Sequence, residues 1–188
     1  MADYPSQLVT HHVLSNGTPV TIRPIRREDS GMEQEFVRHL SADSRYCRFM
    51  GTLLELTPKK LQYFTEIDYD RHMAFVATVM QEGKEMEIGV ARYVATEKPG
   101  NCEFAITVDD AWQGTGVAGL LMIALQEAAC QHGFGTMEGL VLASNRKMLK
   151  FARQLGFKTR HEPGEGDTVH IELQLQCVQA RPATGPSP

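Results

Sequence analysis

Strand-like segments dominate the middle of the chain. Residues 73–79, 87–95 and 102–108 are rich in apolar and β-branched positions, and polar or turn-forming residues separate them. Three successive strands of this kind predict an antiparallel meander. A shorter strand is expected over residues 20–25, ending at Pro24.

Three early helices are predicted from capping residues and from apolar positions that recur about every 3.6 residues. Ser30 and Glu33 have the spacing of a capping box ahead of the first helix. A second helix is expected over residues 42–49. Thr57 is predicted to cap the third, with Pro58 in its first turn.

The clearest helix follows Gly116 and ends near Gly133. Its apolar residues fall on one face when the chain is wound as a helix. They are Val117, Leu120, Leu121, Ala124, Leu125 and Ala128.

The last third of the chain combines one more helix with three strands. A short buried strand is predicted over residues 139–142, and Ser144 is expected to cap a helix that Gly156 terminates. Two final strands are expected over residues 157–160 and 168–175. The order of elements predicts a mixed α/β (α+β) sheet and not a regular βαβ repeat.

One domain is expected over residues 13–175, because no repeat or low-complexity block interrupts them. Residues 1–12 lack an apolar pattern, and residues 176–188 are rich in Pro, Gly and small residues. Such segments bury too little apolar surface to offset their ordering entropy. Both ends are therefore predicted to be mobile, including His11 and His12.

Composition and charge disfavour several classes of protein. The chain has a formal net charge of −4, with 42% hydrophobic and 22% charged residues, and no Lys/Arg cluster of the kind that binds nucleic acids. No run approaches the roughly 20 apolar residues of a membrane span, and the start has no secretory pattern. A cytoplasmic location is expected.

The metal-ligating residue types show no metal-binding spacing. Four cysteines, Cys47, Cys102, Cys130 and Cys177, lie far apart without a CxxC pair, and no HxxxH or HExxH motif occurs. We expect no metal site, and we expect the four cysteines to be reduced, packed thiols.

The segment from Val108 to Ala118 carries the chemistry. A strand runs through a short turn into the clearest helix, and Gly114 and Gly116 permit positive φ angles and close approach of a ligand. The free N–H groups and positive dipole end of the helix face the same turn. This arrangement predicts a cradle for a pyrophosphate.

Two other interpretations of these glycines are open. Gly114, Gly116 and Gly119 also spell a dinucleotide fingerprint, with Glu138 near the position of a ribose-binding acid. Residues 109–113 disfavour it, since they separate the glycines from the strand. The glycines could also serve only as a turn and a helix cap.

The segment from Gln113 to Ala118 resembles the GNAT acetyl-CoA signature, (Gln/Arg)-x-x-Gly-x-(Gly/Ala). Asn145 and the Leu155-Gly156-Phe157 run resemble the next helix and strand of that superfamily. Upstream, the segments IRPIRREDS, LSADSRYCRF and IDYDRHMAFVA are similar to bacterial protein-lysine acetyltransferases. The resemblance covers residues 18–175 approximately, and it implies a GNAT-like, largely antiparallel central sheet flanked by helices.

The resemblance implies acetyl-CoA as cosubstrate and assigns residues to it. The pyrophosphate is expected at Gln113, Gly114, Thr115, Gly116, Val117 and Ala118, and the pantetheine arm along the backbone of Ile106, Thr107 and Val108. Asn145 is expected to orient the CoA arm, although a local helix cap is an equal alternative.

Glu103 is the predicted general base. Alternation along residues 102–108 places Glu103 on the face opposite Cys102 and Phe104, and the resembling enzymes have their catalytic glutamate ten residues before Gln113. The simpler alternative is a solvated strand glutamate.

No general acid is assigned. The tyrosine that many GNAT enzymes place seven residues after the motif asparagine is Ala152 here. Tyr46 and Tyr93 are candidates, but packed aromatic residues are the commoner interpretation.

The implied function is direct transfer of an acetyl group to a primary amine, preferably a protein lysine, without a covalent enzyme intermediate. A non-catalytic acetyl-CoA-sensing module is a second hypothesis, motivated by Ala152. A third is an acetyltransferase for a small-molecule amine, with Asp68, Asp70 and Glu103 in an acidic pocket. Monomer and homodimer are both open.

Overall fold

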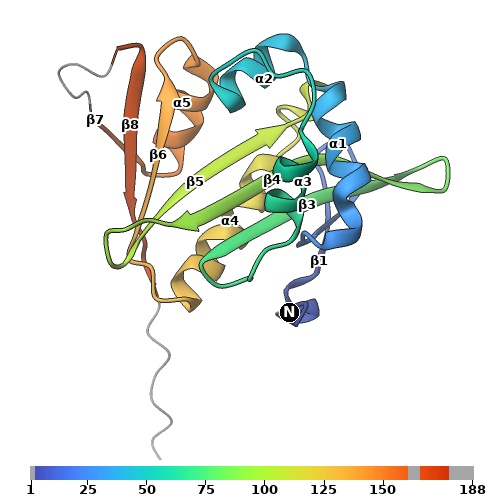
Figure 1. The fold of residues 1–188 in the computed structure, drawn as a ribbon, viewed down its shortest axis with the longest axis horizontal. Coiled ribbons are helices and arrows are strands. Elements are labelled where there is room, and N and C mark those ends of the chain that lie inside the picture. Colours follow the sequence, from blue (N-terminus) through green and yellow to red (C-terminus); the bar gives the residue numbers. More distant parts are fainter. Residues whose placement is uncertain (1–2, 161–165, 178–188) are drawn as a thin grey trace, which may run out of the picture.

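Residues 3–160 and 166–177, which the computed structural model describes, contain eight strands in one sheet of order β1-β2-β3-β4-β5-β6-β8-β7 (Figure 1). The strands are β1 (Thr10–Val13), β2 (Pro19–Pro24), β3 (His72–Gln81), β4 (Lys84–Ala95), β5 (Asn101–Val108), β6 (Thr136–Leu142), β7 (Lys158–Arg160) and β8 (Thr168–Gln174). Neighbours are antiparallel except β5 and β6, which are parallel. The predicted meander and the mixed sheet are confirmed.

Helices cover both faces of the sheet. The helices are α1 (Ser30–His39), α2 (Ala42–Phe49), α3 (Pro58–Thr65), α4 (Val117–Gln131) and α5 (Arg146–Gln154), with short 3-10 turns at η1 (Ser6–Leu8), η2 (Arg27–Asp29) and η3 (Asp110–Trp112). Figure 1 shows α1 and α3 on the near face and α4 on the far face. Among the described residues, no helix has both the length and the apolar character needed to cross a membrane.

Two hydrophobic cores follow from the period-two alternation of the strands. The larger core packs α4 and α5 against one face of the sheet, with Tyr93, Leu121 and Ile171 fully buried. The smaller core packs α1 and α3 against the other face, around Phe36 and Val76. The apolar stripe of α4 therefore faces the larger core, as its spacing predicts.

Two predicted caps are wrong and a third is confirmed. Asp29 precedes α1, while Glu33 is buried beneath the helix and accepts a hydrogen bond from Arg92, so it cannot close a capping box. Asn145, and not Ser144, caps α5 by accepting from the N–H of Met148. Thr57 caps α3 as predicted, accepting from the N–H of Lys60.

Strand β1 was not predicted, because its residues show no apolar alternation. It pairs with β2 in register, Thr10 opposite Ile22 and Val13 opposite Pro19. His11, expected in a flexible end, lies in this strand, and its Nδ1 is 3.1 Å from Oγ1 of Thr21. An edge strand with exposed side chains needs no apolar face, so the sequence pattern is weak.

The expectation of four reduced thiols is wrong for two of them. Cys130, at the end of α4, forms a disulfide with Cys177, 47 residues later, with a Cα–Cα distance of 5.2 Å. Cys47 and Cys102 are free. The pairing depends on how the segment after β8 returns to α4, which spacing along the chain does not reveal. The tail predicted to be mobile comprises residues 176–188. Within it the disulfide holds Cys177 to α4, contrary to the expectation, and residues 178–188 lie outside the described residues.

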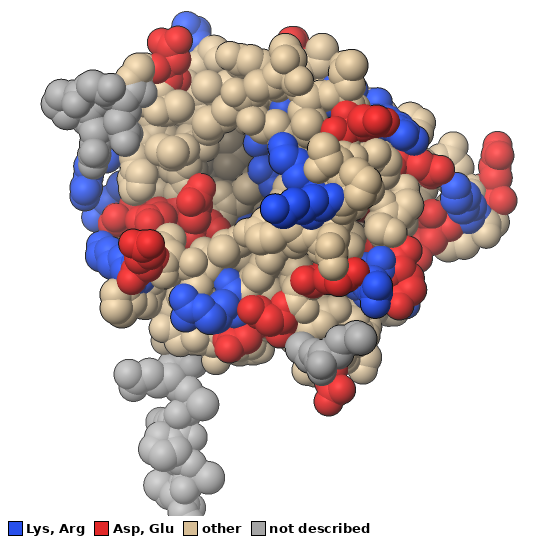
Figure 2. Space-filling view, in the orientation of Figure 1, with Lys and Arg blue, Asp and Glu red and all other residues tan. Residues whose placement is uncertain are grey.

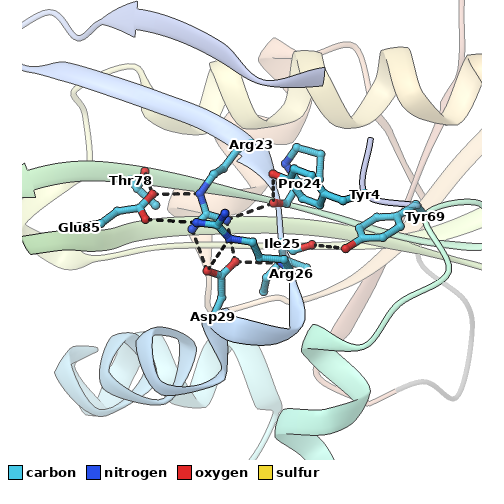
Figure 3. Close-up of polar contacts among 9 residues, drawn as sticks. All are labelled: Tyr4, Arg23, Pro24, Ile25, Arg26, Asp29, Tyr69, Thr78 and Glu85. Atoms are coloured by element: carbon cyan, nitrogen blue, oxygen red, sulfur yellow. Dashed lines mark hydrogen bonds and ion pairs between the residues drawn. The ribbon is translucent and has the colours of Figure 1, made fainter. Parts of the chain in front are cut away.

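A buried ion pair fixes β2 to the start of α1 (Figure 3). Arg23 donates from both terminal nitrogens to Asp29, at 2.7 and 2.8 Å, and from Nε to Glu85 at 2.9 Å. Asp29 also accepts from the N–H of Arg26. Although partial burial acts in the opposite direction, hydrogen bonds from Arg23 and Thr78 hold the pKa of Glu85 below its usual value.

Replacing Asp29 by Ala should therefore destabilise the fold by about 3 kcal/mol, since removing one partner leaves the other charge buried. Urea denaturation would measure the free energy of unfolding. The matched control is Glu55→Ala, which breaks the exposed Arg38–Glu55 pair and should cost less than about 1 kcal/mol. Equal losses of unfolding free energy in the two variants would show that the buried Arg23–Asp29 pair stabilises the fold no more than an exposed pair does.

Candidate active site

The site lies where β5 and β6 separate. The two strands pair only over Asn101–Glu103 and Thr136–Glu138, and from there they diverge. A cleft of about 1260 Å³ opens between them, lined by α2, β5, the 113–119 loop and the start of α5. Figure 2 shows a hollow in this face, with acidic side chains on one side and basic side chains on the other.

A close contact between Phe104 and Gly139 marks the point of divergence. A Cβ atom at Gly139 would lie 3.1 Å from Cε1 of Phe104 and 3.2 Å from its carbonyl oxygen. The Phe104 ring also packs on Phe157, with 4.9 Å between the ring centroids. Only glycine fits beside Phe104 without pushing the strands further apart.

The predicted phosphate loop has the geometry of an anion cradle. Gly114 and Gly116 have φ angles of 80° and 96°, and nothing lies within 4 Å of a Cβ placed on either residue. Gly116 is the N-cap of α4, so the N–H groups of Val117 and Ala118 fall in the first turn, where a helix supplies no acceptor. Gln113, Gly114, Gly116, Val117 and Ala118 all line the cleft.

Thr115 is the one predicted loop residue that does not line the cleft. Its hydroxyl donates to the carbonyl of Trp112 at 2.7 Å, and its own carbonyl accepts from both the N–H and the hydroxyl of Ser15. Ser15 lies in the turn between β1 and β2. The loop is thus held in shape by a contact 100 residues away in sequence.

The end of β5 offers a free strand edge. Ile106, Thr107 and Val108 line the cleft, and their hydrogen-bonded partner strand is β4 on the other side. Thr107 is buried, and its hydroxyl has no hydrogen-bond partner. An extended ligand arm could therefore pair with this edge as an added strand.

Glu103 is exposed and lines the cleft, on the face opposite the buried Cys102 and Phe104, as the alternation predicts. The register of the sheet places Glu138 beside it, and Glu172 beside Glu138.

The start of α5 forms another wall of the cleft. Asn145 lines the cleft, but its side-chain oxygen is engaged as the cap of α5, 3.0 Å from the N–H of Met148. Lys147 donates to Oε1 of Gln113 at 3.2 Å, which ties this helix to the phosphate loop.

Helix α2 contributes Tyr46, a candidate general acid, together with residues that the sequence patterns did not single out. Asp110 accepts hydrogen bonds from the hydroxyls of Ser41 and Ser44, at 3.0 and 2.8 Å, and so fastens α2 beside the loop. Although partial burial opposes it, a hydrogen bond from the N–H of Ser41 and the bonds from the two hydroxyls hold the pKa of Asp110 below its usual value. Tyr46 and Arg48, on the same helix, also line the cleft.

Other residues considered from the sequence lie elsewhere. Tyr93 is buried, with its hydroxyl bound to the carbonyl of Asp70 and to His132, and burial raises its pKa. Asp68 accepts from the N–H groups of Asp70 and His72 and does not line the cleft. The acidic pocket of Asp68, Asp70 and Glu103 that would support a small-amine acceptor is therefore not formed.

The chain resembles known acetyltransferases over most of its length. The family model of the acetyltransferase (GNAT) domain matches residues 20–158. Acetyltransferase PA5475 of Pseudomonas aeruginosa is 38% identical over 162 residues, which are 86% of this chain and 87% of that protein.

Solved structures show the same fold. The crystal structure of the GNAT domain of S. lividans PAT is 28% identical, has a TM-score of 0.83, and is matched over 92% of this chain and 100% of that chain. The structure of yncA from Salmonella typhimurium, a putative acetyltransferase with its cofactor acetyl-CoA, has a TM-score of 0.66 at 20% identity, over 87% of this chain and 98% of that one. Among the described residues, no group of three or more His, Cys, Asp or Glu side chains could hold a metal ion.

The loop geometry generates a prediction about ligand binding. Replacing Gly116 by Val places a branched side chain in the cradle, so we expect the affinity for acetyl-CoA to fall by about tenfold or more in isothermal titration.

Gly83→Val is the matched control, because Gly83 also has a positive φ, 79°, and open space around its Cβ position, but lies in the β3–β4 hairpin. Both variants should suffer the same backbone strain, about 1–3 kcal/mol. An unchanged acetyl-CoA affinity in the Gly116 variant would remove the loop from the binding site.

Proposed function

Because the chain belongs to the GNAT acetyltransferase family, we propose that it transfers the acetyl group of acetyl-CoA directly to a protein lysine, with Glu103 as general base. The family membership itself makes the protein an acyltransferase. The observation that supports the finer proposal is that Glu103, the free edge of β5 and the 113–118 loop open into one cleft.

The residues present fit acetyl-CoA. The cradle at Gly114 and Gly116 has room that a side chain would fill, and the first turn of α4 presents N–H groups to it. The free backbone edge at residues 106–108 suits an amide-bearing arm. When bound, acetyl-CoA supplies the acetyl group as a thioester.

Glu103 would remove a proton from the attacking amine. A lysine amine has a reference pKa of about 10.4, so only about one part in 2,500 is neutral at pH 7. An exposed carboxylate at the mouth of the cleft can accept the proton directly or through a water molecule. The neutral amine then attacks without a covalent enzyme intermediate.

Backbone N–H groups of β5 would stabilise charge on the thioester carbonyl oxygen. The edge of Ile106–Val108 that faces the cleft is not paired with β6. Fixed donors of this kind cost no reorganisation during the reaction. Asn145 would hold the start of α5 in place through its cap, which supports the cap alternative over direct contact with the CoA arm.

A protein acceptor is favoured over a small amine by the shape of the site. Apolar side chains at the rim are exposed, notably Tyr46 at 49%, Met50 at 42% and Leu140 at 43%. The acidic pocket that would have suited a small polyamine is not formed.

Glu103→Gln should lower kcat with a lysine peptide by about a hundredfold or more at pH 7, because a positioned general base contributes at least that much. Acetyl-CoA affinity should be unchanged, as measured by titration. Glu172→Gln is the control, since Glu172 lies in the same row of carboxylates but outside the cleft. Similar turnover in the Glu103 variant and the wild type would exclude Glu103 as the base.

A further inference from the structure

Arg48 of α2 forms part of the wall of the cleft. Ser44 and Arg48 are four residues apart on α2, so they share a face of the helix. The hydroxyl of Ser44 donates a hydrogen bond to Asp110, which lies beside the phosphate loop. Arg48 lies one turn further from the loop, and it lines the cleft together with Glu103.

Two aromatic rings limit the freedom of the Arg48 side chain. Its guanidinium carbon is 5.1 Å from the centroid of the Phe49 ring and 5.9 Å from that of Phe64. Stacking of this kind holds a guanidinium while leaving its N–H groups free to donate in the plane.

The charge of Arg48 is not neutralised by a direct partner. Within the described residues it makes no hydrogen bond and no ion pair, unlike Arg45, which donates to two backbone carbonyls, and Arg92, which pairs with Glu33 at 3.4 Å.

Arg48 nevertheless stays charged at neutral pH. Burial, together with the positive charge of Arg92, lowers its pKa to about 10, while Glu33 and Glu103 act in the opposite direction. A half-buried cation without a hydrogen-bonded anion is costly unless a ligand supplies one. The planar guanidinium matches a carboxylate, which it can bind with two parallel hydrogen bonds.

We propose that Arg48 binds a carboxylate of the acceptor, so that the enzyme prefers lysines that have an aspartate or glutamate next to them. The proposal rests on the proposed function, in which the acceptor amine meets Glu103. The acceptor is the favoured source of the carboxylate because Arg48 lies one helical turn beyond Ser44, which contacts Asp110 beside the loop, and because its charge interacts with that of Glu103. An acyl group that ends in a carboxylate is the other source of the same chemistry.

The test uses two peptides that differ only in the residue after the lysine, Glu in one and Gln in the other. For the wild type, kcat/KM should be about tenfold higher for the Glu peptide, mainly through KM, which is the effect of one charge-assisted pair. Arg48→Gln should reduce this ratio to within about twofold of unity. Arg48→Lys should keep part of the preference, since it retains charge but not the planar donor geometry.

Arg153→Gln is the control, because Arg153 is an exposed arginine at the end of α5 outside the cleft. It should retain the full preference. Equal kcat/KM for the two peptides with the wild type would overturn the proposal without any variant. Two results with Arg48→Gln would also overturn the proposal. One is weaker acetyl-CoA binding in titration. The other is a changed ratio of succinyl-CoA to acetyl-CoA use with an unchanged preference between the two peptides.

Failure of the proposed function would give a different result. If the wild type acetylated neither peptide, the lysine acceptor would be wrong, and peptide binding in the presence of CoA would replace turnover as the readout. Tighter binding of the Glu peptide, lost in Arg48→Gln, would still support the carboxylate site. Equal binding of both peptides would overturn it.

Discussion

The parallel pairing of β5 and β6 stops after three residue pairs, and the rest of the site depends on this. Each strand keeps its other partner, β4 for β5 and β8 for β6, so the sheet remains whole while its centre opens. Unpaired backbone in a protein interior is costly. The opening is therefore stable only where water or a ligand reaches the unpaired backbone. As a result, the free N–H donors of the strand edge lie in the cleft.

The same divergence brings two helix starts to one opening. The N-termini of α4 and α5 both border the cleft, and the contact from Lys147 to Gln113 joins them. The positive dipole ends and free N–H groups of both helices therefore lie on the same side of the cleft. The carboxylate of Glu103 lies at the start of the divergence, where the acceptor amine would arrive under the proposed function. The proposed phosphate loop and the proposed base thus lie at opposite ends of β5 and open into one cleft.

Local patterns were sufficient to predict much of this arrangement. The glycines of the 113–118 loop, the stripe of α4 and the alternation that exposes Glu103 depend on residues close in sequence, and the structure has them as expected. What could not be predicted depends on distant partners. Glu33 has the spacing of a capping residue, but a buried arginine from β4 engages it. Cys130 and Cys177 carry no spacing signal, and the Ser15 contact to the loop spans 100 residues.

The replacement of the family's tyrosine by Ala152 is explained by packing. Ala152 has no exposed surface and lies in the larger core, while the residues of α5 that line the cleft are Arg146, Lys147, Met148 and Phe151. A tyrosine at position 152 would have to displace core residues, which a close-packed interior resists. A tyrosine is absent at position 152 because α5 packs this position into the core, where its side chain could not reach the cleft. A thiol with a pKa of about 8.5 leaves adequately as its anion, so the site needs no proton donor on α5. The absence of tyrosine is therefore weak support for a module that only senses acetyl-CoA, and the open carboxylate at Glu103 favours an enzyme.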